Sequence, residues 1–259
     1  MADVVVWLSN QSPRCMTGTV QIDSTPITYV ILAIVVVTCI LFQVIMRLRQ
    51  RARSRSLQEY ASSIGFAFHL HGDPSIDPWY ERFEVFRIGR SRRAFNTLSG
   101  EIETATARIH VIMGDFRYVI ERGVGKDRRR TVRKFSYLIS QSPWRNAPEL
   151  LIRPEGMKDR FFAFFGAEDI DFESDSFSRA FFVRSPDRKF AYDLIDHDMM
   201  DFLMETRPPL IDLEEGALCL CTSRGQWEVE EFRRKLDWVG GFFAKWPSHL
   251  VKRLSGEAP

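Results

Sequence analysis

The longest uniform pattern in the chain is an uninterrupted apolar stretch near its start. Residues 27–46 (ITYVILAIVVVTCILFQVIM) contain no charged side chain. At about 1.5 Å of rise per residue, a helix of this length spans roughly 30 Å, the thickness of the hydrocarbon core of a bilayer. In lipid, a lone segment satisfies its backbone hydrogen bonds only as a helix. The stretch therefore predicts one membrane-spanning helix.

After this stretch, apolar and polar positions first follow a short helical period and then alternate. The period predicts an amphipathic helix over residues 57–68, ended by Gly65. Alternation is typical of strands that bury one face, and glycine-containing turns separate the alternating segments. We expect strands at 83–88, 94–98, 104–113, 116–120, 132–140 and 150–152. Together they predict an antiparallel meander of five or six strands.

The second half mixes both periods. Helices are expected at 158–165, 189–194, 199–206 and 227–239, the last broken or kinked by Gly240 and Gly241. A strand is expected at 181–184, and a hairpin from 210–213 and 218–222. The fold class is therefore α+β: an N-terminal transmembrane helix followed by an antiparallel β-sheet domain with packed helices. The expected division is 1–26 outside, 27–46 spanning, 47–56 as an arginine-rich linker, and 57–255 as the domain, which could be subdivided near 146–156.

Arginines follow the apolar stretch at every second position of the segment RLRQRARSRS. Short flanks rich in arginine stay in the cytoplasm, so we expect residues 1–26 outside and the domain inside. A cleaved signal peptide, the competing interpretation, needs a basic N-terminal region and a shorter apolar core. The same arginines could also attract anionic headgroups of the lipid bilayer. They are Arg47, Arg49, Arg51, Arg53 and Arg55.

Composition and charge narrow the function classes. The chain of 259 residues is 45% hydrophobic and 27% charged, which is typical of a folded protein, and its formal net charge is +2. Residues 57–146 carry an excess of basic side chains and residues 147–259 an excess of acidic ones. Without a strong overall positive charge, the domain is not expected to bind nucleic acid. Cys219 and Cys221 share one face of a predicted strand and are expected to be buried.

A second basic segment, KDRRRTVRK, lies between two predicted strands and is expected to form a hairpin loop. It could bind anionic lipid headgroups or an acidic partner, or it could be a solvated turn. No aromatic residue is interleaved with its charges, which argues against RNA or DNA. Its cations are Lys126, Arg128, Arg129, Arg130, Arg133 and Lys134.

Signals for catalysis and metal binding are weak. On a helix, Asp193, His197 and Asp201 would line up at intervals of four residues, a pattern compatible with a metal-assisted hydrolase. Asp196, however, stands where an N-cap is expected. His69, His71 and His110 lack a regular metal-ligand spacing. We find no motif of a hydrolase, metalloprotease, P-loop or kinase, so we predict no metal and no cofactor.

From residue 169 onward the amino-acid sequence resembles that of a bacterial family of single-pass, membrane-anchored proteins of unknown function. The family has a Phe-Glu-Ser-x-x-Phe block followed by spaced Asp, Ala and Leu positions and a Met-rich helix. Ser178 stands where the family usually has Asn, and His197-Asp198 replaces a common Thr-Pro. The matching positions are Phe172, Glu173, Ser174, Phe177, Phe181 or Phe182, Val183, Asp187, Ala191, Ile195, Met199 and Met200.

The resemblance implies a bacterial inner membrane and a tethered cytoplasmic domain, and it implies no activity. Two function hypotheses therefore stand side by side. The first is a non-enzymatic, membrane-tethered interaction module with an unidentified protein partner. The alternative is a metal-assisted hydrolase with a site around Asp193, His197 and Asp201. The aromatic residues 161–165 are expected in the core, with membrane or partner contact as the alternative.

Overall fold

The computed structural model describes residues 26–72, 77–123, 128–155, 169–222 and 225–256. The chain divides into two compact units, Met1–Gln50 and Arg51–Pro259. The predicted segment 1–25, the predicted helix 158–165 and Lys126 lie outside the described residues.

Helix α1 (Pro26–Ser63) contains the predicted spanning stretch. Within the described ranges it is the one helix that is long and apolar enough to cross a membrane by length and composition, and none of its apolar window is buried in the protein. The helix continues without a break through residues 47–63. The expected linker at 47–56 is therefore helical, because arginine, glutamine, leucine and alanine favour helix and no glycine or proline interrupts them. Gly65, with φ of +73°, follows the end of the helix as predicted, but residues 67–68, which were expected in the same amphipathic helix, belong to strand β1 (Ala67–His69) instead.

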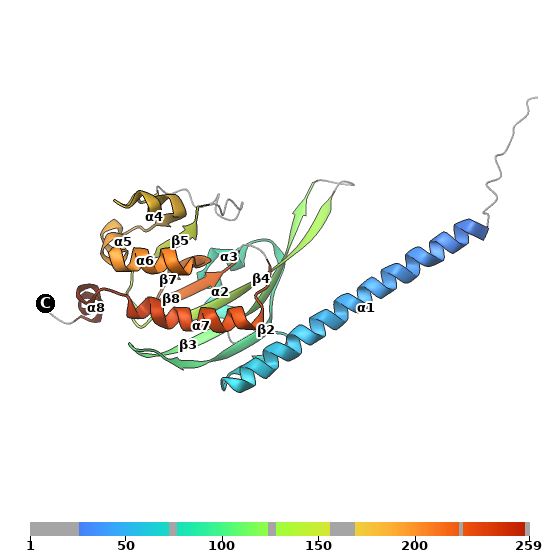
Figure 1. Ribbon diagram of the computed structural model, residues 1–259, viewed down its shortest axis with the longest axis horizontal. Coiled ribbons are helices and arrows are strands. Elements are labelled where there is room, and N and C mark those ends of the chain that lie inside the picture. Colours follow the sequence, from blue (N-terminus) through green and yellow to red (C-terminus); the bar gives the residue numbers. More distant parts are fainter. Residues whose placement is uncertain (1–25, 73–76, 124–127, 156–168, 223–224, 257–259) are drawn as a thin grey trace, which may run out of the picture. The chain divides into compact units, whose positions relative to one another are not determined.

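Eight strands form one antiparallel sheet in the order β1-β2-β3-β4-β8-β7-β5-β6 (Figure 1). This confirms the predicted fold class. Strands β1–β4 and β5–β8 share the sheet, so residues 146–156 do not separate two sheets. The strands are β1 (Ala67–His69), β2 (Arg90–Glu103), β3 (Arg108–Arg122), β4 (Arg129–Gln141), β5 (Leu150–Pro154), β6 (Phe181–Arg184), β7 (Leu210–Glu214) and β8 (Ala217–Cys221).

The two faces of this sheet carry different helices. The larger core lies under the last turns of α1 and under α4 (Asp175–Ala180), α5 (Arg188–Leu194), α6 (His197–Thr206), α7 (Val229–Ala244) and α8 (Ser248–Ser255). A smaller, aromatic core lies on the other face, beneath α2 (Asp77–Arg82) and α3 (Glu84–Arg87). Figure 1 shows α7 running across the first of these faces. Cys219 and Cys221 are buried in the smaller core, as expected from their spacing.

Several local predictions are wrong for identifiable reasons. Residues 83–88 form no strand, because α3 buries Val85 and Phe86 against the sheet as a short helix. The turns expected between the predicted strands, at Ser99-Gly100 and at Gly114-Asp115, are instead interior parts of β2 and β3. Helix α7 runs through Gly240 and Gly241 to Ala244, because Trp238, Phe242 and Phe243 anchor it in the core. Burial of apolar side chains here outweighs the cost of about 1 kcal/mol per helical glycine.

Candidate functional site: an anchored helix root and a basic ribbon

The last turns of α1 carry one inward-facing stripe. Arg53, Ser54, Leu57, Tyr60 and Ala61 recur at intervals of three and four residues, which places them on one side of a helix. Leu57 and Ala61 are fully buried and belong to the larger core. The helix that begins as the apolar stretch therefore ends as a packed element of the domain.

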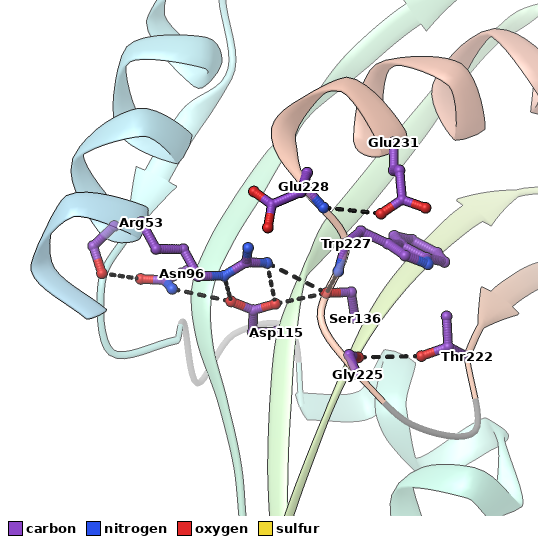
Figure 2. Close-up of polar contacts among 10 residues, drawn as sticks. Arg53, Asn96, Asp115, Ser136, Thr222, Gly225, Trp227, Glu228 and Glu231 are labelled. Atoms are coloured by element: carbon purple, nitrogen blue, oxygen red, sulfur yellow. Dashed lines mark hydrogen bonds and ion pairs between the residues drawn. The ribbon is translucent and has the colours of Figure 1, made fainter. Parts of the chain in front are cut away.

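Arg53 on this stripe forms a bidentate ion pair with Asp115 of β3 (Figure 2). Arg53 Nε donates to Asp115 Oδ2 and Arg53 Nη2 donates to Asp115 Oδ1, each at 2.9 Å. The Asp115 side chain is completely buried, and that of Arg53 is 15% exposed. Two parallel charge-assisted hydrogen bonds fix the orientation of the guanidinium as well as its position. Removal of either partner would leave a costly unpaired charge.

The Asp115 carboxylate also accepts hydrogen bonds from neighbouring polar side chains (Figure 2). Asn96 Nδ2 donates to Oδ2 at 3.1 Å, and Ser136 Oγ donates to Oδ1 at 2.7 Å. Ser54 Oγ of α1 donates to Asn96 Oδ1 at 2.8 Å, while the Trp227 backbone N–H donates to Ser136 Oγ at 2.8 Å. The junction thus connects α1, three adjacent strands and the segment that leads into α7. A fully satisfied buried network of this kind favours one arrangement of its elements.

Strand β2 is shaped to bring Asn96 to this junction. Its register against β3 shifts between Phe95 and Leu98, as in a β-bulge. Asn96 itself has φ of +50°, a left-handed conformation that asparagine tolerates better than most residues. Gly114 of β3 lies close to this bulge. A Cβ added to Gly114 would lie 2.8 Å from the Asn96 carbonyl oxygen. Glycine is therefore required for the close approach of the two backbones.

The predicted juxtamembrane arginines separate into two kinds. Arg47, Arg49, Arg51 and Arg55 are exposed on α1. Arg53 is committed to Asp115 instead of being available to lipid headgroups. Sequence spacing did not distinguish it, because its partner lies 62 residues away.

The predicted basic loop is mostly strand. Arg129, Arg130, Arg133 and Lys134 lie in β4, which begins at Arg129 because residues 129–134 continue the ladder with β3. Arg128 immediately precedes the strand. We call residues Val119–Arg122 of β3 and Arg128–Lys134 the basic ribbon. Strand β2 pairs with β3 no further than Val119. Beyond that point β3 and β4 extend as a two-stranded projection (Figure 1).

One acidic side chain of the ribbon, Glu121, is paired within it. Arg128 donates to the Glu121 carboxylate, and Arg90 of β2 lies 3.8 Å away. The hydrogen bond from Arg128 lowers the pKa of Glu121. Arg129, Arg130 and Arg133, by contrast, have no carboxylate within 4 Å among the residues that the structure describes, and Arg129 and Arg130 are exposed. The ribbon therefore presents an excess of positive charge to its surroundings.

The acidic residues suggested for a hydrolase do not converge. Asp193 is paired with Arg253 of α8 at 2.6 Å. His197 lies 3.7 Å from Asp201, but its side chain is 89% exposed. An open recess of about 490 Å³ is lined by His197 but not by Asp193 or Asp201. Their arrangement therefore supports no shared site, and the described ranges contain no group of three or more His, Cys, Asp or Glu that could hold a metal ion.

Several of these residues, and the block that resembles a bacterial family, have a structural role. Asp196 accepts a hydrogen bond from the Met199 backbone N–H at 3.0 Å and caps α6, as predicted. Ser174 and Asp187 cap α4 and α5 in the same way. Phe177 and Ala191 are fully buried. The spacing of acids and aromatics in this block is thus accounted for by helix caps and by burial in the core.

Two acidic side chains that the sequence analysis did not single out, Asp212 and Glu214, lie on β7. Burial raises the pKa of the Asp212 carboxyl well above its usual range, with a further contribution from Glu214. Burial also raises the pKa of Glu214, to about 7, and Glu149 adds to the effect. Arg184 and Arg87 oppose these shifts. Both acids lie in a segment that the sequence pattern predicts as an ordinary strand. No sequence signal therefore marked them.

No family model matches the sequence, and no curated protein matches it significantly. The structure is similar to the crystal structure of the mycobacterial trehalose monomycolate transport factor A, TtfA, with a TM-score of 0.52 at 14% sequence identity. The similarity covers 76% of this chain and 97% of that chain. At this identity the likeness shows a shared α+β fold.

Proposed function

We propose that this chain is a non-enzymatic, membrane-tethered module that holds an anionic partner at the cytoplasmic surface of a bacterial inner membrane. The Arg53–Asp115 ion pair is the observation that carries the proposal. Arg53 follows Met46, the last residue of the apolar stretch, by seven positions, a distance that even an extended chain limits to about 25 Å. The same strand that holds Asp115 continues into the basic ribbon. The last turns of α1 and the charged surface are therefore joined through one polar junction.

The similarity to TtfA adds support of a limited kind. TtfA is described as a transport factor for trehalose monomycolate, and this chain shares its fold. An accessory role that works through binding agrees with the scattered positions of Asp193, His197 and Asp201. The proposed membership in a bacterial family of membrane-anchored proteins agrees with it as well.

The orientation rests on the energetics of arginine. Moving a guanidinium to the centre of a bilayer costs several kcal/mol, and five arginines follow the apolar stretch. We expect a protease added to right-side-out vesicles to leave the C-terminal domain intact, and to digest it once the vesicles are opened. Digestion of the domain in sealed vesicles would show the opposite orientation and would overturn the cytoplasmic placement.

The interaction itself is tested by crosslinking the full-length chain in native membranes. The variant R129E/R130E/R133E reverses three ribbon charges, and the matched variant K189E/R234E/K252E reverses three exposed cations on α5, α7 and α8. We expect the ribbon variant to lose a discrete crosslinked species that the matched variant keeps. Equal crosslinking by both variants would remove the ribbon as the recognition surface.

A further inference from the structure

Strand β4 has an unpaired edge along the basic ribbon. On one side β4 pairs with β3 throughout, as far as Arg122↔Arg129. On its other side β8 pairs only with Tyr137–Gln141, and Gly225 makes a single bridge to Phe135. Within the described part of the chain, no strand pairs with β4 on that side between Arg129 and Lys134.

The backbone groups that face this open edge can be identified from Ser136. Its N–H donates to the Gly225 carbonyl oxygen at 3.2 Å, and its carbonyl oxygen accepts from the Thr222 N–H at 3.3 Å. Both groups of Ser136 therefore point away from β3. Because successive residues of an antiparallel strand point their backbone groups to opposite sides, Arg130 and Val132 present theirs to the open edge, whereas Lys134 adjoins the bridge between Phe135 and Gly225 and is not part of that edge.

Positive side chains flank this edge on both faces of the ribbon. Arg130 and Lys134 share the face of Ser136, with Val132 between them, while Arg129 and Arg133 project from the other face. Val132 is 51% exposed. Glu121 lies across from Arg130 on β3, but it is engaged by Arg128. A segment added beside β4 would thus meet cations on both faces at its ends and an apolar residue at its centre.

Resting on the proposed function, we propose that residues 129–133 of β4 bind an extended acidic peptide segment as an added antiparallel strand. Backbone hydrogen bonds would give affinity, and side chains would give specificity. Opposite Arg133, Val132, Thr131, Arg130 and Arg129 in that order, the complementary sequence is Glu-Val-Thr-Glu-Glu. Carboxylates directly across from guanidinium or ammonium groups are the favourable cross-strand pairs.

Two other occupants fit this edge less well. A second copy paired antiparallel through the same edge would place cations beside cations, and like charges directly opposite are destabilising. Lipid phosphates could approach the cations, but they have no donors for the carbonyl oxygens of Arg130 and Val132. The alternation of backbone donors and acceptors favours another polypeptide strand.

Full-length protein in phosphatidylcholine nanodiscs provides the test, with the fluorescent peptide Glu-Val-Thr-Glu-Glu as the probe and anisotropy as the readout. We expect R129A/R130A/R133A to weaken binding at least tenfold. V132P removes the N–H that faces the open edge and should also weaken binding at least fivefold, whereas V132A should change it less than twofold. The ladder to β3 uses Thr131 and Arg133, so V132P is compatible with the fold.

A second measurement does not depend on the folding of V132P. Peptides N-methylated at alternate residues, in each of the two registers, are titrated against the unchanged chain. One register should lose binding at least fivefold and the other should retain it, because only one set of peptide N–H groups faces β4. Binding that falls with the arginine variant but is unaffected by V132P and by both methylated peptides would identify a charge-only surface, of the kind that lipid headgroups use, and would overturn strand addition.

The two proposals fail in different ways. If the crosslinked species of the membrane experiment is lost in R129E/R130E/R133E but kept in V132P, the anionic partner stands and strand addition falls. If neither variant changes that species, the ribbon is not the recognition surface and both proposals fall.

Discussion

Arg53 and Asp115 lie 62 residues apart in sequence and meet through two hydrogen bonds of 2.9 Å each. The arginine belongs to the helix that begins as the apolar stretch, and the aspartate belongs to an interior strand of the sheet. A side chain that sequence placed in a membrane-flanking cluster is therefore a structural link between anchor helix and domain.

Breaking this pair is expected to be costly. Changing Asp115 to Ala leaves Arg53 without its carboxylate and Asn96 and Ser136 without their shared acceptor. We expect the free energy of unfolding to fall by about 3 kcal/mol, the low end for a buried pair because Arg53 retains some contact with solvent. Urea unfolding of the full-length chain in detergent, followed by Trp fluorescence, measures this loss.

The control for this prediction is Arg55→Ala, an exposed neighbour on the same helix, which should change stability by less than about 0.5 kcal/mol. In a double-mutant cycle, R53A and D115A together should cost clearly less than the sum of the single losses. Additive losses would show that the two side chains do not stabilise each other.

Two glycine-to-alanine substitutions should change the stability of the fold in opposite directions. Gly114→Ala places a Cβ 2.8 Å from the backbone oxygen of Asn96, so either the bulge or the strand must move. We expect a loss of about 2 kcal/mol or more, as for other overpacked sites. Gly240→Ala, inside α7, meets only a methyl carbon of Thr104 at 3.9 Å and should gain about 0.5–1 kcal/mol from helix propensity. Chemical denaturation of both variants distinguishes these outcomes, and a neutral Gly114→Ala would contradict the close approach of the strands.

Glu214 should make the fold more stable in mild acid. Its pKa is about 7 in the folded chain, above the ordinary value of 4.5. Its contribution is therefore fully present below about pH 4.5, and it is lost as pH rises through 7. Glu214→Gln imitates the protonated form. Because solvent screens this half-buried group, we expect a gain of only about 2 °C in Tm at pH 8.

The difference should disappear at pH 4, where the native side chain is also protonated. Scanning fluorimetry at both pH values tests this, with the exposed Glu205→Gln as the control that should show no pH-dependent gain. An equal effect of Glu214→Gln at pH 4 and pH 8 would contradict the raised pKa.

The acids of α6 should behave as structural groups. Asp196→Ala removes the cap on the Met199 N–H and should cost about 1 kcal/mol, whereas Asp196→Asn, which can also cap, should cost a few tenths. His197→Ala, at an exposed position, should leave stability nearly unchanged. Stoichiometric metal bound by the native chain and lost in His197→Ala would contradict this reading and restore the hydrolase hypothesis.

Much of the fold could be predicted because its signals are local. The apolar stretch at 27–46, the strand at 181–184, the β7–β8 hairpin and the Asp196 cap each depend on residues within a few positions of one another. The short run 83–88 was misread as strand because periodicity cannot distinguish a short helix from a strand when both bury two or three apolar side chains. Gly114-Asp115 was misread as a turn because glycine and aspartate are frequent in turns. Nothing in the neighbouring residues shows that this pair belongs to a buried junction instead.

By itself, the sequence determined that a bilayer-length apolar helix precedes an α+β domain and that cations gather at 47–56 and 126–134, because length, periodicity and charge are local properties of the chain. Only the tertiary structure decided that Arg53 is bound to Asp115, that Arg129–Arg133 form an open strand edge, and that Asp212 and Glu214 resist ionisation. These depend on which distant segments meet and exclude water, and the free energy of a buried charge or an unpaired backbone group is set by that environment.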